Sequence, residues 1–233
     1  MKIHFILVEP AVPENIGAAA RAIKTMGFSS LRLVNTKDHL DEKAGWVAHA
    51  SREILEKAET FSSLKEAVKD MDWIIGTSAK KRRVNEDFYP INKINAFIEA
   101  KANSIHNVAI VFGREESGLT NEELKLCDIV TTIPMKTTYP SLNLAQSVMI
   151  YAYTLSMLNY DKKETLDQKA GQAELILLKN KTKNFLATIG FKEDSAIYNR
   201  IMERLMLLGE TDIHLLLSIE NKIYKKFQEN LDN

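Results

Sequence analysis

The sequence contains a single cysteine, Cys127, among its 233 residues. One thiol cannot form a disulfide within the chain and cannot build a cysteine-based metal cluster. The histidines do not compensate, because none of them stands at a spacing typical of metal ligands. They occupy positions 4, 39, 49, 106 and 214. The sequence therefore predicts a protein without a bound metal.

Neither sign of charge is in excess. The 31 lysines and arginines balance the 31 aspartates and glutamates, so the formal net charge is zero. Proteins that bind nucleic acid through their overall field are strongly basic, and this composition gives no such signal. If RNA is the partner, local groups must bind it. The only dense basic run, KKRR at residues 80–83, fits either a phosphate contact or a solvated loop.

Long apolar runs are also missing. The first ten residues, MKIHFILVEP, lack a complete signal-peptide core. The longest apolar helix that we expect, Leu144 to Leu158, is interrupted by glutamine, serine and threonine, unlike a membrane span. We therefore expect a soluble, cytoplasmic protein with no membrane partner.

Short apolar strands alternate with amphipathic helices over residues 1–160. The expected strands include Ile3–Val8, Leu31–Val34, Asp72–Thr77 and Ile129–Ile133. Helical periodicity fills the segments between them, for example Glu42 to Lys57. This alternation predicts an α/β domain with a mainly parallel sheet. The pattern G-x-G-x-x-G does not follow the first strand, so a Rossmann-type nucleotide oxidoreductase is disfavoured.

A polar segment separates this domain from the rest of the chain. Residues 161–172, DKKETLDQKAGQ, are charged and contain no aromatic residue, which suits a linker. Residues 173–233 carry three helical patterns, separated by Gly190 and by Gly209-Glu210-Thr211. The sequence thus predicts three parts: a catalytic domain at 1–160, a linker at 161–172 and a small all-helical appendage at 173–233.

Three stretches concentrate polar residues near the ends of expected strands. In chain order they are Pro13 to Arg21, Asn107 to Leu119 and Ile133 to Ala145. The first contains the pattern N-x-G-x-x-x-R, which begins at Asn15. The second, NVAIVFGREESGL, is a buried strand followed by a polar turn. The third, IPMKTTYPSLNLA, leads from a strand into an apolar helix for which Ser141 is a natural N-cap.

These three stretches, in this order, resemble the SPOUT superfamily of trefoil-knotted RNA methyltransferases, and within it the TrmJ-like tRNA ribose 2′-O branch. The resemblance implies an α/β fold with a mainly parallel sheet and a C-terminal trefoil knot at about 108–160. It also implies S-adenosyl-L-methionine as cofactor, RNA as substrate and a homodimer. Each active site would borrow Arg21 from the partner chain. The substrate is expected to be tRNA, methylated on cytidine or uridine at anticodon-loop position 32.

The resemblance places the cofactor at the ends of three successive strands. The residues expected to bind it are Thr77, Ser78, Ala79, Gly113, Ile133, Met135, Ser141 and Leu142. Backbone groups at such positions can hold an adenine and a ribose, and apolar side chains can pack the ring. Taken singly, each stretch also fits a strand end or turn with no ligand.

The resemblance also supplies a catalytic set, consisting of Asn15, Arg21, Glu115, Ser141 and Asn143. A guanidinium keeps its proton in proteins, so Arg21 is better suited to orienting the substrate phosphate and ribose than to acting as a base. Simpler interpretations remain open at this stage: a solvated residue for Arg21, helix caps for Asn15 and Ser141, and a surface turn acid for Glu115.

The alternatives to a tRNA enzyme are methylation of rRNA or of another tRNA position, and a noncatalytic RNA-binding protein of the same fold. The polar residues of the catalytic set argue against the noncatalytic alternative. The C-terminal helices differ from those of relatives with strongly basic tails, because this tail is neutral overall. Because of that difference, the sequence does not decide whether the tail binds tRNA or which nucleotide is the target.

Overall fold

The computed structural model describes residues 1–36, 40–79, 88–101, 104–137, 141–158 and 166–229. The basic run at 80–83 therefore lies outside the described residues. The chain folds into two compact units. The first comprises residues 1–96 and 107–160, and the second comprises 97–106 and 161–233.

A parallel sheet of seven strands forms the centre of the first unit, counted over the described residues. Its strand order is β3-β2-β1-β6-β4-β7-β5, and every pair of neighbouring strands is parallel. The strands are β1 (Lys2–Val8), β2 (Ser30–Val34), β3 (Glu59–Phe61), β4 (Trp73–Thr77), β5 (Phe88–Pro90), β6 (Asn107–Phe112) and β7 (Ile129–Thr132). The predicted α/β fold with a mainly parallel sheet is confirmed.

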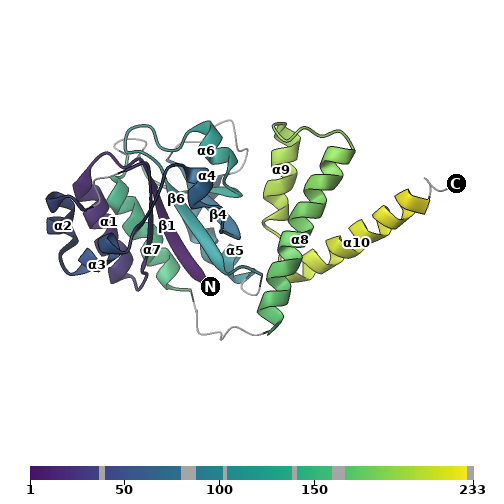
Figure 1. The fold of residues 1–233 in the computed structure, drawn as a ribbon, viewed down its shortest axis with the longest axis horizontal. Helices are drawn as coiled ribbons and strands as arrows, with labels where there is room; N and C mark the ends of the chain where they lie inside the picture. The colour runs from purple at the N-terminus through teal and green to yellow at the C-terminus, as the bar shows by residue number, and fades with distance from the viewer. Residues whose placement is uncertain (37–39, 80–87, 102–103, 138–140, 159–165, 230–233) are drawn as a thin grey trace. The chain divides into compact units, whose positions relative to one another are not determined.

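Helices cover both faces of this sheet, as Figure 1 shows. α1 and α7 pack on one face, and α4 and α6 lie on the other. The helices of this unit are α1 (Pro13–Thr25), α2 (Glu42–Ala48), α3 (Arg52–Glu56), α4 (Leu64–Ala67), α6 (Asn121–Lys125) and α7 (Leu144–Ser156), with 3₁₀ turns at His49–Ser51 and Ile91–Lys93. The helix α5 (Ile94–Glu99) begins in this unit, and its residues 97–99 belong to the second unit.

Double coverage explains why the central strands are apolar on both sides. In β1, residues 3–8 are all buried, and successive side chains alternate between the two faces. Ile6 belongs to the core beneath α4 and α6, while the ring of Phe5 lies 6.4 Å from that of Phe112. Packing on both faces of the sheet therefore anchors the strands whose ends build the pocket described below.

Two parts of the first unit differ from the sequence-based expectation. The helix expected over Glu42–Lys57 is broken, because His49 adopts φ +45° and ends α2, and α3 begins only at Arg52. The strands β3 and β5 were not predicted. Each has three residues and lies at an edge of the sheet, so neither shows the apolar run that identified the central strands.

The predicted N-cap of α7 was also wrong. Asn143, not Ser141, caps this helix: its Oδ1 accepts hydrogen bonds from the backbone amides of Ala145 and Gln146. The Gln146 side chain in turn accepts from the Asn143 backbone amide, which completes a capping box. Both residue types are good caps, and the chain uses the one two residues closer to the first apolar helical position.

The C-terminal helices belong to the second unit and are described by themselves. They are α8 (Leu166–Thr188), α9 (Ala196–Leu205) and α10 (Glu210–Glu229). α8 begins at Leu166, so the second half of the predicted linker is helical. Thr182 Oγ1 donates a hydrogen bond of 3.0 Å to Glu220 between α8 and α10, and Lys101 Nζ donates one of 2.6 Å to the carbonyl of Leu208. Residues 97–106, predicted in the first domain, thus pack with this unit.

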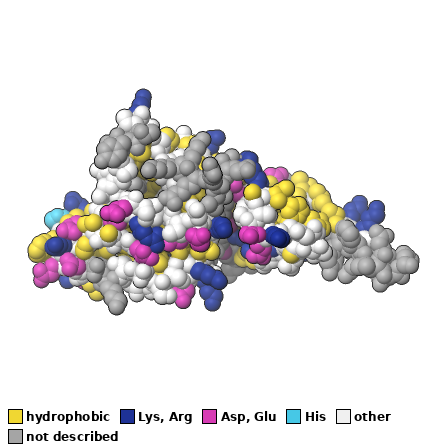
Figure 2. All heavy atoms as spheres, turned by 90° about the horizontal axis from the view of Figure 1, so that it is seen from above, with side chains coloured by type: hydrophobic (Ala, Val, Ile, Leu, Met, Phe, Trp, Pro, Cys, Tyr) yellow, Lys and Arg dark blue, Asp and Glu magenta, His cyan; other side chains and the backbone are white. Residues whose placement is uncertain are grey.

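On the face drawn in Figure 2, lysine and arginine side chains are interspersed with acidic ones. None of the described helices combines the length and the apolar content that crossing a membrane requires.

Candidate functional site

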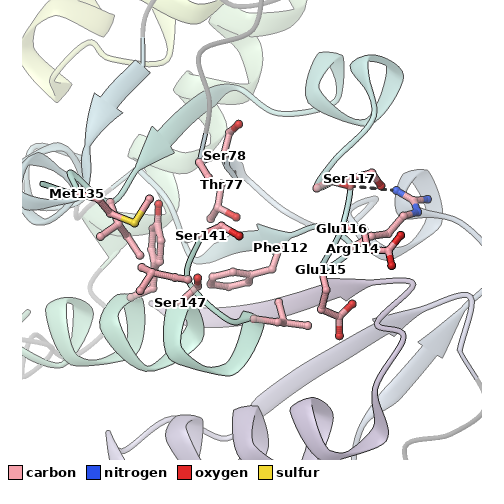
Figure 3. Close-up of a pocket in the computed structure, with 17 residues that line it drawn as sticks. Thr77, Ser78, Phe112, Arg114, Glu115, Glu116, Ser117, Met135, Ser141 and Ser147 are labelled. Atoms are coloured by element: carbon pink, nitrogen blue, oxygen red, sulfur yellow. Dashed lines mark hydrogen bonds between the residues drawn. The ribbon is translucent and has the colours of Figure 1, made fainter. Parts of the chain in front are cut away.

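A pocket of about 200 Å³ lies at the carboxyl ends of three neighbouring strands, β6, β4 and β7. In parallel sheets these ends face one edge, which is where open α/β folds bind ligands. Figure 3 shows Thr77, Ser78 and Ser141 close together in this pocket, with Arg114 toward its rim. The lining residues are Thr77, Ser78, Ala79, Phe112, Gly113, Arg114, Glu115, Glu116, Ser117, Gly118, Ile133, Met135, Ser141, Leu142, Leu144, Ser147 and Tyr151.

The structure brings all eight predicted cofactor positions into this one pocket. They come from the carboxyl ends of β4, β6 and β7 and the segments that follow, and the first and last of them, Thr77 and Leu142, are 65 residues apart in the sequence. Two members of the predicted catalytic set, Glu115 and Ser141, line the same pocket. Asn15 and Asn143 adjoin it through hydrogen bonds, and Arg21 is not among the lining residues.

Two aromatic rings form a rigid part of the pocket wall. Phe112 and Tyr151 meet edge to face with ring centroids 5.3 Å apart. The Tyr151 hydroxyl is buried and lies 2.7 Å from Thr131 Oγ1. Burial raises the pKa of Tyr151, so the phenol is neutral at physiological pH and does not serve as a base.

Gly113 permits the sharp turn at the end of β6. A Cβ at this position would lie 2.1 Å from the carbonyl carbon of Gly118 and 2.2 Å from the backbone nitrogen of Leu119. No side chain fits there, because both obstacles are backbone atoms. The loop can therefore fold back on itself, and Arg114 and Gly118 exchange two backbone hydrogen bonds of 2.9 and 3.3 Å.

A directional chain of hydrogen bonds connects three residues of the predicted catalytic set. Asn143 uses its Oδ1 to cap α7, so its Nδ2 donates to Asn15 Oδ1 at 2.8 Å. Asn15 then has only its Nδ2 to offer, and this donates to Glu115 Oε1 at 2.9 Å. The helix cap thus orients both asparagines and points an amide donor at the carboxylate. The start of α1, the start of α7 and the loop after β6 are held together.

Glu115 is ionised in this arrangement. Burial alone would raise the pKa of its carboxyl group, but the backbone amide of Ala11, at 3.0 Å, and the Asn15 side chain both donate to it. These donors outweigh burial, and the pKa of Glu115 lies below its ordinary value. A carboxylate with a lowered pKa is a weak base, so its geometry favours holding α1 in place over accepting a proton.

Arg114 fastens the outer side of the same loop. Its Nε donates to Glu9 at 2.7 Å, and its two terminal nitrogens donate to Glu123 at 3.0 and 3.1 Å. The hydrogen bond from Arg114 lowers the pKa of Glu9. The stabilisation from this pair is therefore full above the ordinary pKa of a glutamate and is lost as pH falls through the lowered value.

We expect Arg114→Ala to lower the free energy of unfolding by about 1 to 3 kcal/mol, because it removes charge-assisted hydrogen bonds and leaves two carboxylates facing each other. Backbone amides 114–118 should exchange hydrogen faster. Glu9→Gln, which weakens only one of the two ion pairs, should have a smaller effect on both readouts. Denaturant titration and hydrogen exchange measure them. Unchanged exchange in the loop would show that Arg114 does not hold it.

Arg21 occupies a different side of α1. It is exposed and follows Asn15 by six residues, which corresponds to about 9 Å along the helix and about 240° around it. The face of α1 that carries Asn15 toward Glu115 is therefore not the face that carries Arg21. Within one chain, the structure does not unite Arg21 with the other four residues of the catalytic set.

Sequence reasoning missed several lining residues, among them Phe112, Arg114, Leu144, Ser147 and Tyr151. The helical spacing of the last three, at i, i+3 and i+7 from Leu144, marks one face of α7 and could have identified them. Phe112 and Arg114 flank Gly113 directly, but nothing in the sequence separates a wall residue from an ordinary strand end. For a metal, no group of three or more His, Cys, Asp or Glu side chains converges within the described ranges.

Comparison with known proteins gives consistent matches. The SpoU rRNA Methylase family matches residues 2–153, and the C-terminal domain of tRNA/rRNA methyltransferase LasT matches residues 172–227. The chain is 42% identical to "Uncharacterized tRNA/rRNA methyltransferase LasT" of Escherichia coli over 97% of its own length and 100% of that protein. It is 36% identical to tRNA (cytidine/uridine-2′-O-)-methyltransferase TrmJ of Photorhabdus laumondii, over 74% of this chain and 71% of TrmJ.

Solved structures share the fold. A probable methylase family protein from Haemophilus influenzae superposes with a TM-score of 0.65 at 30% identity, covering 98% of both chains. The SpoU methyltransferase AviRb from Streptomyces viridochromogenes, solved in complex with the cofactor AdoMet, superposes with a TM-score of 0.53 at 20% identity over 66% of this chain and 59% of AviRb. At that identity, the second match speaks for the fold alone.

Proposed function

The chain belongs to the SpoU rRNA Methylase family, and from this premise we propose that it transfers a methyl group from S-adenosyl-L-methionine to a ribose 2′-oxygen of RNA, with tRNA as the substrate. The observation that carries the proposal is the joining of the pocket to α1 through Asn143, Asn15 and Glu115. A pocket alone could hold many ligands. Here hydrogen bonds hold a small-molecule pocket next to the polar N-terminal end of α1. A second substrate, the RNA, can lie against that end of the helix.

The pocket suits the proposed cofactor. The walls formed by Phe112, Ile133 and Leu142 offer apolar contact to an adenine ring, and the hydroxyls of Thr77 and Ser141 offer polar contacts to a ribose. The room in front of Gly113 lets the ligand approach the backbone closely. When bound, the cofactor supplies a methyl group already activated on a sulfonium, so the protein needs no covalent intermediate.

The residues of the chain contribute orientation. Ser141 and Glu115 lie at the pocket, and Asn15 and Asn143 bridge it to α1, so the four define where a ribose can lie relative to the methyl group. In-line placement of the attacking oxygen can account for much of the rate enhancement of such a transfer. The proton of the 2′-hydroxyl must leave during the reaction. The lowered pKa of Glu115 makes this carboxylate a poor acceptor for it.

A homodimer completes the site in this proposal. Arg21 lies on a face of α1 turned from the pocket side, so a second chain related by two-fold symmetry can receive it. Within the chain Gly17, Ala19, Ala20 and Ala22 are already buried, Gly17 against α2, so Ala18 and Arg21 are the residues of this run that remain open to a partner chain. We also propose the trefoil knot of the resembling superfamily for residues 108–160. The strand order supports a threaded path, because β7 is inserted between β4 and β5, both formed earlier in the chain.

RNA binding is proposed to extend to the second unit. All lining residues of the pocket lie between Thr77 and Tyr151, so residues 173–233 serve the RNA and not the cofactor. The interspersed charges of Figure 2 make local contacts, not a global field, responsible for binding. The tRNA anticodon loop, with cytidine or uridine at position 32, is the proposed target, and the cytoplasm is the corresponding location.

The test is methyl transfer itself. The protein is incubated with labelled cofactor and bulk tRNA, the RNA is digested to nucleosides, and 2′-O-methyl products are sought by mass spectrometry. We expect label on a ribose and none on a base. A transcript with a 2′-deoxy nucleotide at the modified position should accept no label, because the attacking oxygen is absent. Label confined to bases, or equal transfer to the deoxy substrate, would contradict the proposal.

A further inference from the structure

Trp46 is the most exposed large aromatic side chain in the described residues. Its exposed fraction is 67%, whereas the other tryptophan of the chain, Trp73, is fully buried. Tryptophan is large and strongly apolar, and in most folded proteins the greater part of it is covered. A tryptophan exposed to this extent offers a large aromatic surface to a binding partner.

The helix that carries Trp46 is held rigidly against α1. A Cβ on Gly17 of α1 would lie only 2.1 Å from the carbonyl oxygen of Ala44, so the two helix backbones are in direct contact. Ala44 and Ala48 of α2 are completely buried. Beyond the end of α2, Lys24 of α1 donates to the carbonyl of Ala50 at 2.5 Å. Trp46 thus projects from a fixed support.

The neighbours of Trp46 on α2 and α1 include positively charged side chains. Lys43 stands three residues before Trp46, which places both on one side of α2, and each is exposed. Arg21 follows Gly17 by four residues and so lies on the face of α1 that contacts α2. The acidic side chains of the helix start, Asp41 and Glu42, are at its N-terminal end, where Asp41 caps the helix.

This support is also close to the proposed site. Gly17 is two residues from Asn15, and Ala44 is two residues from Trp46, so the Cα atoms of Asn15 and Trp46 are within about 15 Å of each other by helix geometry. A few nucleotides of an unpaired RNA strand span such a distance. One substrate molecule can therefore contact both the Trp46 side chain and the hydrogen-bonded start of α1.

We propose that Trp46 is a stacking platform for an unpaired base of the RNA substrate, with Lys43 available to a neighbouring phosphate. The inference rests on the proposed function and adds to it a contact outside the pocket. Unpaired bases stack on aromatic side chains whatever their identity, and single-stranded loops are where proteins make such contacts. A loop substrate, and not a continuous duplex, follows from the platform.

Fluorescence provides a direct readout, because Trp46 is the only one of the two tryptophans that a soluble quencher can reach. We expect added tRNA to quench the emission of Trp46 and to protect it from acrylamide. Trp46→Ala should raise KM for tRNA by about 5- to 100-fold, the range that loss of one stacked base implies. The affinity for S-adenosyl-L-methionine should not change. Trp46→Phe should restore most of the loss.

Leu40→Ala is the matched control, since Leu40 is another exposed apolar residue, at 62%, just before α2. It should leave KM for tRNA unchanged. An unaltered KM in Trp46→Ala, with active wild-type enzyme, would overturn the proposal. A second result would also overturn it: Trp46 is protected from acrylamide in the absence of RNA, and dilution of the protein removes this protection. That result would mean that a second copy of the chain covers Trp46. If the wild type methylates no RNA, the proposed function fails, and the tRNA titration of Trp46 fluorescence still decides whether the platform exists.

Discussion

Replacing Arg21 with alanine should lower kcat for methyl transfer by about two to three orders of magnitude and leave cofactor affinity nearly unchanged. The expectation follows from the position of Arg21, exposed on α1 and outside the pocket of its own chain. A guanidinium there cannot contact the cofactor in that pocket, but it can hold the substrate phosphate and ribose in the site of a partner chain. Steady-state kinetics with tRNA and calorimetry with the cofactor separate the two effects.

Two variants control this experiment. Arg52→Ala removes another exposed arginine, whose only ion pair is with Glu56 one turn away among the described residues, and should leave kcat unchanged. Arg21→Lys keeps the charge but not the planar fork, so it should recover only part of the loss. If Arg21→Ala weakened cofactor binding as much as turnover, the residue would belong to the pocket and the proposed orienting role would be wrong.

Adding one methyl group at Gly113 should impair the other half of the site, the binding of the cofactor. In Gly113→Ala the new Cβ would lie 2.1 and 2.2 Å from backbone atoms of Gly118 and Leu119, so the loop after β6 must open. Overpacking against backbone costs about 1 to 3 kcal/mol, and a displaced loop also loses its contacts with the ligand. We expect cofactor affinity to fall by about tenfold or more, measured by calorimetry.

The control for Gly113→Ala is Gly45→Ala. Gly45 lies inside α2, and a Cβ there would meet nothing within 4 Å. This change should leave cofactor binding intact and stabilise the protein by up to about 1 kcal/mol, because alanine favours a helix. A thermal melt of each variant shows whether the fold survives. Normal cofactor affinity in folded Gly113→Ala protein would mean that the ligand binds elsewhere.

The two large effects can be combined to test the homodimer. A chain carrying Arg21→Ala keeps an intact pocket, and a chain carrying Gly113→Ala keeps an intact arginine. If each site takes Arg21 from its partner, a mixed dimer contains one complete site. Co-expression of the two variant chains, assayed at a cofactor concentration too low to fill the Gly113→Ala pocket, should then give roughly one quarter of the wild-type activity, because half of the randomly paired dimers are mixed and each mixed dimer has one complete site of two. No recovery would show that Arg21 serves its own chain.

The sequence predicted the parts of this molecule that depend on local pattern. Buried strands such as Asn107–Phe112 were found because both of their faces are covered, which leaves a continuous apolar run. The eight cofactor positions were named from a resemblance and then found in one pocket, because parallel strands place their carboxyl ends at one edge. Their role as ligand contacts stays a prediction.

Other features depend on contacts between distant residues and could not be derived from pattern. Ser141 and Asn143 are both suitable caps, and the hydrogen bond of Asn143 to Asn15 involves a residue 128 positions away. The break at His49 follows from a backbone turn with positive φ that its residue type does not demand. The separation of Arg21 from Asn15 was implicit in their spacing of six, which is not a whole number of helical turns.

The strand order has a consequence for how the chain is made. The neighbours of β4 in the sheet are β6 and β7, and the neighbour of β5 is β7. Both β4 and β5 therefore leave the ribosome before any strand with which they pair. The β1-β2-β3 group, by contrast, can pair as soon as it is synthesised. Trp73, Ile74 and Ile75 of β4 must therefore wait, unpaired, for residues 107–112 to emerge. During that interval the nascent chain exposes an apolar strand edge, which is the kind of surface that chaperones bind and that aggregates recruit.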